Sequence, residues 1–208
     1  MKLVLLGPPG SGKGTHAMWM CGEYKIPHIS TGAMLREEER RNPHLYEEIR
    51  HYIDRGELVP DELIFEILKE RLAESDCRDG YILDGFPRTL KQAEMLEALG
   101  GVDLAVMIDT MPELIMERVR GRRVCPRCGK GYHISQIPDG KCTDCGAEVT
   151  IRSDDKPETI RNRFDVYDRV THPLVEHYKN EGKLARIDGS GTIGEVAAEI
   201  RALLNGGV

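Results

Sequence analysis

A glycine-rich stretch near the start of the chain, GPPGSGKGT at residues 7–15, limits the possible folds more than any other feature. It follows a short aliphatic run, KLVLL, that is typical of a buried parallel strand. Glycines at this point let backbone N–H groups converge on anionic oxygens without hindrance from a Cβ atom, and Lys13 adds a positive charge beside the start of the next helix. A plain glycine-rich turn is the alternative, but the order of strand, turn and helix, with Lys and Thr in the turn, predicts a phosphate-binding loop.

Short aliphatic runs and amphipathic segments alternate along the rest of the chain. Further strands are expected at 26–31, 80–86, 104–109 and 184–188. Helices are expected at 15–24, at two places within 31–55 with the second beginning near Pro43 and stopping at Gly56, and at 60–74, 89–99, 112–122, 157–179 and from about 193 onward. This alternation predicts an α/β protein with a three-layer P-loop fold, in which a central parallel sheet of about five strands is flanked by helices.

The composition excludes several classes of protein. With 208 residues, 40% of them hydrophobic and 31% charged, the chain is expected to be a soluble globular protein with one substantial core. Its apolar runs fall well short of the roughly 20 residues that span a bilayer, and the loop at 7–15 ends the apolar start before it reaches the length of a signal peptide. We therefore expect a cytoplasmic protein without a membrane partner. The net charge of −6 argues against a general nucleic-acid binder.

Four of the six cysteines form two Cys-x-x-Cys-Gly units in the segment 124–149. In a chain without an export signal this pattern favours metal binding, with paired disulfides as the alternative. The candidate ligands are Cys125, Cys128, Cys142 and Cys145. Four thiolates complete the tetrahedron of a structural zinc ion and leave no open position for catalysis, although four thiolates also accept iron. The other two cysteines, Cys21 and Cys77, are expected to be buried or half-buried.

Three motifs follow one another along the chain: GKGT at 12–15, STGAMLR at 30–36 and LDGFPRT at 83–89. In this order they resemble the adenylate kinases, a family of nucleoside monophosphate kinases that interconvert MgATP plus AMP with two ADP. The resemblance extends over nearly the whole chain. One departure is Ala33, which stands where the family usually has Asp, so that any contact made by that carboxylate is absent.

The resemblance implies a division of the chain into three parts. The P-loop core would consist of 1–29, 60–121 and 156–208, with a helical AMP-binding insert at 30–59 and a lid over ATP at 122–155. In some members of the family a zinc ion cross-links this lid through such cysteines. The resemblance therefore implies one structural Zn²⁺ per chain here. A segment of about 30 residues is too short to build a sufficient core alone, so a metal would supply the missing cohesion.

The resemblance also implies two sets of binding residues. Those expected to contact ATP are Gly10, Ser11, Gly12, Lys13, Gly14, Thr15, Arg118, Arg122, Gly131, Tyr132 and Gly191. Those expected to contact AMP are Thr31, Arg36, Glu57, Leu58, Val59, Gly85, Phe86, Pro87, Arg88, Gln92, Arg152 and Arg163. The Gln92 amide suits an adenine edge that both donates and accepts hydrogen bonds, and Tyr132 is expected to stack near the ATP base. Gly191 is equally consistent with a turn glycine.

The reaction itself needs no general base, because the second pKa of a monophosphate is about 6 and its attacking oxygen is already largely deprotonated at pH 7. What remains is positioning and charge stabilisation by Lys13, Mg²⁺ and guanidinium groups. The expected catalytic set is Lys13, Asp84, Arg88, Arg118, Arg122, Arg152 and Arg163. Asp84 is expected to hold Mg²⁺ through water, with a helix or turn cap as the alternative. Asp154 and Asp155 match a family pair beside the lid hinge and are expected to orient arginines in the closed state, or to cap the helix that follows at Pro157.

Two other functions compete with AMP phosphorylation. A kinase for UMP or CMP would use the same phosphate-binding groups. A zinc-ribbon nucleic-acid module on a vestigial nucleotide fold is the alternative from another class, and the negative net charge gives it no support. We expect a monomer whose partners are ATP, AMP and ADP and which binds no nucleic acid.

Overall fold

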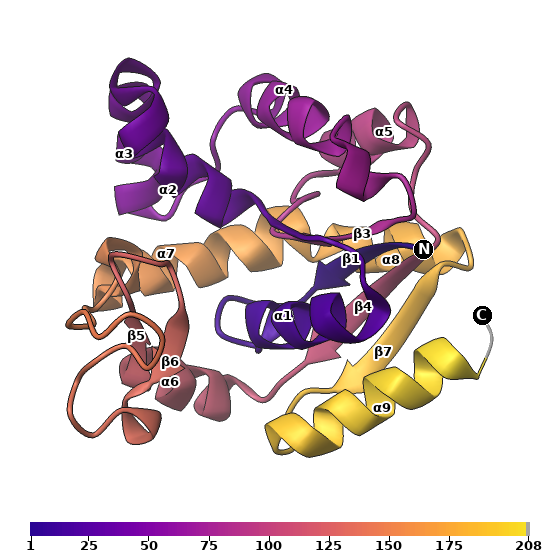
Figure 1. Cartoon of the computed structure of the whole chain (residues 1–208). Coiled ribbons are helices and arrows are strands. Elements are labelled where there is room, and N and C mark those ends of the chain that lie inside the picture. Colours follow the sequence, from indigo (N-terminus) through magenta and orange to yellow (C-terminus); the bar gives the residue numbers. More distant parts are fainter. Residues whose placement is uncertain (207–208) are drawn as a thin grey trace.

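A five-stranded parallel sheet forms the centre of the computed structural model, which describes residues 1–206 (Figure 1). Its strands are β1 Lys2–Leu6, β2 His28–Ser30, β3 Tyr81–Asp84, β4 Leu104–Asp109 and β7 Leu184–Asp188. They lie in the order β2-β3-β1-β4-β7, and every neighbouring pair is parallel. The predicted α/β fold with a parallel sheet is confirmed.

The helices also follow the sequence pattern. They are α1 Lys13–Tyr24, α2 Thr31–Arg41, α3 Pro43–Arg55, α4 Asp61–Leu72, α5 Leu90–Glu97, α6 Pro112–Gly121, α7 Pro157–Val166, α8 Pro173–Asn180 and α9 Ile193–Asn205. The helix predicted over 157–179 is present as α7 and α8, with a wider π-type turn at Tyr167–Thr171 between them. Pro173 lacks a backbone N–H and therefore begins a new helix at this point.

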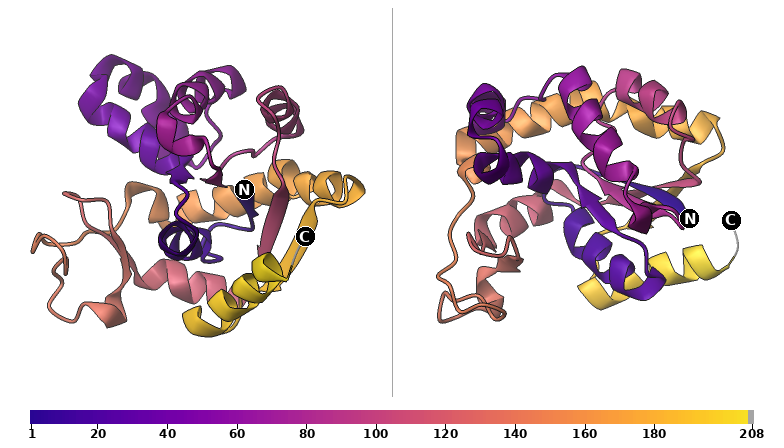
Figure 2. Two further views of the ribbon diagram at one scale, coloured as in Figure 1. Left: turned by 45° about the vertical axis from the view of Figure 1, so that its right-hand side comes forward. Right: turned by 45° about the horizontal axis from the view of Figure 1, so that its top comes forward.

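Alternate residues of the strands form two separate cores, one on each face of the sheet. On one face Leu3 and Leu5 of β1 pack with residues of α1 and α9, such as Met20 and Ile200. On the other face the intervening Val4 and Leu6 join a larger core that includes residues of α3, α4, α5 and α8. Figure 2 shows the sheet enclosed between these helices. The two-residue period of the strands thus produces the three layers.

The carboxyl ends of the strands meet at one edge of the sheet, where the candidate functional segments gather. The phosphate-binding loop follows β1, α2 follows β2, and Asp84 ends β3. The register places Asp84 beside Leu5 of β1 and beside Ser30 of β2. In open α/β sheets ligands bind outside this edge, so the topology brings the three sequence motifs to one place.

The segment 122–155, called the lid segment below, forms a small lobe near this edge (Figures 1 and 2). It contains an antiparallel pair of short strands, β5 Arg122–Val124 and β6 Gly131–His133. Its own cluster of buried side chains consists of Cys125, Tyr132, Ile137 and Cys142. The boundaries assigned from the sequence to the core, the insert and the lid stay predictions. The helices within residues 1–206 lack the combination of length and hydrophobicity that a membrane-spanning helix needs.

We predict that Gly80→Ala destabilises the fold. Gly80 has a φ of +133°, and a Cβ atom on it would lie 2.0 Å from the carbonyl oxygen of Met1. That oxygen accepts a hydrogen bond from the Tyr81 N–H at 3.0 Å, so the backbone cannot move away without weakening the start of the β1–β3 pair. Denaturant unfolding should show a loss of at least about 2 kcal/mol.

Gly22→Ala provides the control, since Gly22 lies on α1 and nothing within 4 Å would meet its Cβ atom. This variant should gain up to about 1 kcal/mol from helix propensity. Equal stability of the two variants would contradict the close approach of Gly80 to the amino terminus.

Candidate active site

The predicted phosphate-binding loop connects β1 to α1 at the carboxyl edge of the sheet. Gly12, which precedes α1, has a φ of +105° that an L side chain rarely adopts. The Nζ atom of Lys13 donates hydrogen bonds to the carbonyl oxygens of Gly7 and Pro8, at 2.7 and 2.8 Å. Burial, opposed by the charge of Asp84, lowers the pKa of Lys13 to about 8. An anion bound here would give Lys13 a partner of opposite charge at the amino end of α1.

The carboxylate of Asp84 lies against the first turn of α1. A Cβ atom on Gly14 would be 3.3 Å from Asp84 Oδ2, and the same oxygen is 3.3 Å from His28 Nε2. Burial acts to raise the pKa of Asp84, but the hydrogen bond with His28 and the charge of Lys13 outweigh it, so the pKa is lowered and the group is ionised at neutral pH. Within the described residues its carboxylate caps no helix or turn. An ionised carboxylate beside the phosphate loop is the kind of ligand that Mg²⁺ prefers.

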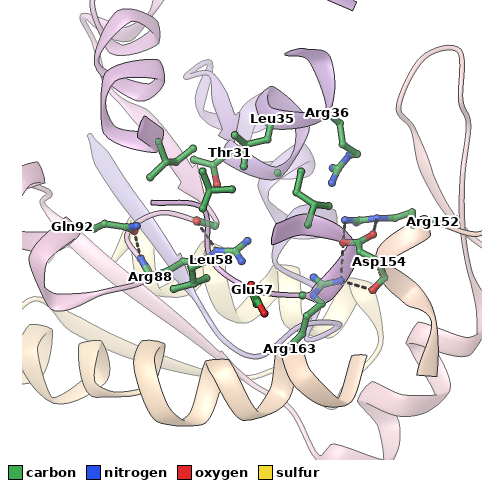
Figure 3. Close-up of a pocket in the computed structure, with 16 residues that line it drawn as sticks. Thr31, Leu35, Arg36, Glu57, Leu58, Arg88, Gln92, Arg152, Asp154 and Arg163 are labelled. Carbon is green, nitrogen blue, oxygen red and sulfur yellow. Dashed lines mark hydrogen bonds and ion pairs between the residues drawn. The ribbon is translucent and has the colours of Figure 1, made fainter. Parts of the chain in front are cut away.

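A second feature of the site is a pocket enclosed by α2, the loop after α3 and the segments 85–92 and 152–163 (Figure 3). We call it the arginine pocket; its charged lining residues are Arg36, Glu57, Arg88, Arg152, Asp154 and Arg163. Figure 3 shows Gln92 and Arg88 on one side and Arg152 and Arg163 on the opposite side. The pocket is also lined by apolar side chains, among them Leu35, Val59 and Ile64. Such a pocket can accept a flat base at the amide end and a phosphate at the guanidinium end.

The structure brings together most of the residues predicted to bind AMP. The arginine pocket is lined by Thr31, Arg36, Glu57, Leu58, Val59, Gly85, Arg88, Gln92, Arg152 and Arg163. Pro87 lines a larger neighbouring cavity instead. Phe86 packs into the core, is only 1% exposed as a whole residue and lines neither of these two cavities.

The larger cavity, called the loop cavity below, extends from the phosphate-binding loop to the lid segment. The predicted ATP-binding residues that line it are Gly10, Gly12, Lys13, Gly14, Thr15, Arg118, Arg122, Gly131, Tyr132 and Gly191. Ser11 is fully buried and lies behind this lining. Arg36, Arg88, Arg152 and Arg163 line both the loop cavity and the arginine pocket. Two ligands bound in the two cavities would therefore meet at these four guanidinium groups.

Two aspartates hold the arginines that enter from the lid segment and α7. Asp155 accepts a bidentate pair of hydrogen bonds from Arg122, with Nε at 2.7 Å. Asp154 accepts from Nε and Nη2 of Arg152 at 2.9 and 2.6 Å and from Arg163 Nη1 at 2.9 Å. Burial acts to raise the pKa of Asp154, but the charges of Arg152 and Arg163 outweigh it and lower the pKa to about 2. The aspartates thus contact arginines in this structure, their role in a closed lid stays a prediction, and α7 begins after Lys156 without a side-chain cap.

Arg118 joins the phosphate-binding loop to the loop between β7 and α9. Its Nη1 donates to the carbonyl oxygen of Ser11 at 3.2 Å, and its Nη2 donates to those of Gly189 and Gly191 at 2.9 and 3.4 Å. Gly191 thus contacts Arg118 through its backbone carbonyl group. Arg118 fixes the backbone around the mouth of the loop cavity.

Tyr132 lines the loop cavity and also packs into the small core of the lid segment. It is 9% exposed, and its hydroxyl lies 3.1 Å from Cys142 Sγ and 3.0 Å from Thr143 Oγ1. This hydroxyl lowers the pKa of the Cys142 thiol by hydrogen bonding. The ring belongs mainly to the small core of the lid segment, and its place beside an ATP base stays a prediction.

The four cysteines of the lid segment lie together, with all Sγ atoms within 4.8 Å of one another. The Sγ–Sγ distances include 3.4 Å for Cys125 and Cys145 and 3.6 Å for Cys128 and Cys142. The described cysteines are free, which contradicts the alternative of paired disulfides. A tetrahedral zinc ion with Zn–S bonds of about 2.3 Å needs Sγ–Sγ distances of roughly 3.8 Å, so the cluster fits such an ion with small adjustments.

Two residues at the site were not predicted from the sequence. His28 is the partner of Asp84, and Asp61 accepts a hydrogen bond from Gln92 Nε2 at 2.7 Å. Both contacts join residues far apart in the chain. Asp61 lies in the first turn of α4, where an acidic residue is common because it interacts favourably with the helix dipole. The local sequence therefore gives no sign that Asp61 contacts the site.

The chain is similar to known adenylate kinases over nearly its whole length. The family profile described as Adenylate kinase matches residues 5–183. The chain is similar to adenylate kinase of Clostridium perfringens (strain SM101 / Type A), with 48% identity over 98% of both chains. It is also similar to adenylate kinases of Clostridium botulinum (strain Eklund 17B / Type B), with 48% identity over 98% of this chain and 99% of the relative, and of Clostridium kluyveri (strain ATCC 8527 / DSM 555 / NBRC 12016 / NCIMB 10680 / K1), with 44% identity over 98% of both. The chain belongs to the adenylate kinase family.

Proposed function

We propose that the chain transfers a phosphoryl group reversibly from MgATP to AMP and so forms two ADP. The observation that carries this proposal is the junction of two cavities at four shared guanidinium groups, beside the loop that holds Lys13. One cavity has the phosphate-binding loop at its base, and the other combines an amide end with a cationic end. This arrangement supports the binding of two nucleotides with their phosphates facing each other.

ATP would occupy the loop cavity. Lys13 and the amino end of α1 would bind its phosphates, while Arg118 holds the loops around it in place. Asp84 would hold Mg²⁺ through water, since its ionised carboxylate lies against the first turn of α1. Mg²⁺ bound with ATP supplies positive charge that offsets the charge developing on the transferred group.

AMP would occupy the arginine pocket, with its base near Gln92 and its phosphate near the arginines. A deprotonated oxygen of AMP attacks the γ-phosphorus in line, the bond from that phosphorus to the bridging oxygen breaks, and ADP leaves. No proton has to be removed first, because the second pKa of the monophosphate is about 6. Arg88, Arg122 and Arg163 would bind the oxygens of the transferred group, and the phosphates would replace Asp154 and Asp155 as partners of the arginines.

The lid segment would depend on a structural zinc ion. Its buried cluster contains two cysteines, Tyr132 and Ile137, which is a small core for a lobe of this size. A zinc ion held by the four thiolates would be closed to substrate and would contribute folding energy.

The same proposal describes a cytoplasmic monomer with an AMP-binding insert at 30–59 and a lid at 122–155. Its partners would be ATP, AMP and ADP, without nucleic acid or membrane.

A coupled assay with MgATP and each of AMP, UMP and CMP tests the proposed reaction. We expect AMP to have the highest kcat/KM, because the Gln92 amide and the apolar lining suit a purine with an amino group. A preference for UMP or CMP would refute the assignment of AMP.

The role of Arg122 is tested by Arg122→Lys. This variant keeps the charge but loses the bidentate geometry that Arg122 now shows toward Asp155, so we expect kcat to fall at least about tenfold. Arg123→Lys is the matched control, because the Arg123 guanidinium donates to the backbone carbonyl oxygens of Arg120 and Arg122. An unchanged kcat in Arg122→Lys would remove Arg122 from the catalytic set.

Elemental analysis of protein purified without added metal tests the cysteine cluster. We expect about one zinc ion per chain, and we expect chelation to lower Tm together with the loss of the ion. Cys142→Ser should abolish stoichiometric binding, whereas Cys21→Ser, outside the cluster, should bind as the wild type does. Iron in place of zinc would correct the identity of the metal, and protein that binds neither would contradict the metal site.

A further inference from the structure

The amide of Gln92 is held in one orientation at the end of the arginine pocket (Figure 3). Its side chain is buried, with 2% exposed. Nε2 donates to Oδ1 of Asp61 at 2.7 Å, and Oε1 accepts from the backbone N–H of Arg88 at 2.7 Å. An ionised carboxylate can only accept and a backbone N–H can only donate, so these two partners determine which end of the amide is nitrogen and which is oxygen.

Asp61 is itself fixed by the start of the neighbouring helix. The Thr89 hydroxyl lies 3.3 Å from both carboxylate oxygens of Asp61 and also accepts the backbone N–H of Gln92 at 3.0 Å. The amino ends of α4 and α5 are therefore connected through Asp61. This contact places a carboxylate next to the amide that lines the pocket.

A primary amide has two N–H donors and two acceptor lone pairs, and the protein uses one of each. One N–H donor and one oxygen lone pair of the Gln92 amide are left for a ligand. Their positions are fixed, because the amide cannot rotate by 180° without cost. Reversal would place the carbonyl oxygen against the Asp61 carboxylate and the amide nitrogen against the Arg88 N–H. It would thus replace two buried hydrogen bonds by two repulsive contacts.

We propose that Asp61 sets the base selectivity of the arginine pocket by holding the Gln92 amide in this orientation, a step that rests on the proposed phosphorylation of AMP. An adenine edge presents a 6-amino donor beside the N1 acceptor, and it pairs with the free oxygen and free N–H of the amide. The hypoxanthine edge presents a 6-oxo acceptor beside an N1–H donor. The free amide oxygen would then face an acceptor and the free amide N–H would face a donor. Asp61 is a positioning residue for Gln92 and selects amino purines over oxo purines.

The test compares AMP with IMP at saturating MgATP. Asp61→Asn keeps the size of the side chain but offers either an acceptor or a donor to Gln92, so that only the Arg88 N–H still opposes reversal of the amide. We expect the ratio of kcat/KM for AMP to that for IMP to fall at least about tenfold, through a higher KM for AMP and a lower KM for IMP. The KM for MgATP should stay within about twofold of the wild-type value.

Glu62→Gln is the matched control, because it makes the same change from carboxylate to amide at the next position. Glu62 is exposed and pairs with Lys91, whereas Asp61 accepts the hydrogen bond from Gln92. The ratio for AMP over IMP should stay within about twofold of the wild-type ratio. A loss of selectivity in this variant as large as in Asp61→Asn would overturn the proposal, because the effect would then be a general one of charge on α4.

Asp61→Ala serves as the second variant if Asp61→Asn unfolds at the assay temperature. It removes the acceptor of the amide hydrogen, and the same fall in the ratio is expected. A wild-type enzyme that prefers AMP, together with Asp61 variants that keep the wild-type ratio within about twofold, would overturn the role of Asp61 and leave the proposed function intact. A wild-type enzyme that prefers UMP or IMP would overturn the proposed function itself.

Discussion

Mutual repulsion among cations is the constraint on which the rest of the site depends. The cations that line the loop cavity around the phosphate-binding loop include Lys13, Arg36, Arg88, Arg122, Arg152 and Arg163. Burial and neighbouring charges lower the pKa of Arg36 and of Arg163 to about 10. Asp84, Asp154 and Asp155 offset part of this charge. In the proposed function, the phosphates of two nucleotides would offset the remaining positive charge, so the repulsion that makes the cluster costly to assemble would also favour binding of these anions.

The fold brings these cations together from distant parts of the sequence. Parallel strands place the phosphate-binding loop, α2 and Asp84 at one edge, and the register of β1, β2 and β3 aligns them. The arginines of the lid segment and α7 are held near the same edge by hydrogen bonds to Asp154 and Asp155. The cysteine cluster lies in the lid segment, where Cys125 and Cys142 belong to its small core and Cys128 lines the loop cavity.

The sequence was sufficient for features that depend on local pattern. Aliphatic runs and helical spacing predicted the sheet and its helices, and paired cysteines predicted their cluster because the two Cys-x-x-Cys units need only face each other. Contacts between distant residues could not be read in the same way. The break at Tyr167–Thr171, the packing of Tyr132 beside Cys142, and the pairs His28–Asp84 and Asp61–Gln92 each depend on tertiary packing that no local pattern encodes.

The most direct measurement is a crystal structure with a bisubstrate analogue in which a phosphate chain joins two adenosines. Our account predicts one adenosine in each cavity, with Arg88, Arg122 and Arg163 at hydrogen-bonding distance, about 3 Å, from the phosphates that correspond to the transferred group. Arg122 and Arg163 would then have exchanged Asp155 and Asp154 for phosphate oxygens. A complex in which these arginines stay on the aspartates, and the phosphate chain lies outside the junction of the two cavities, would contradict it.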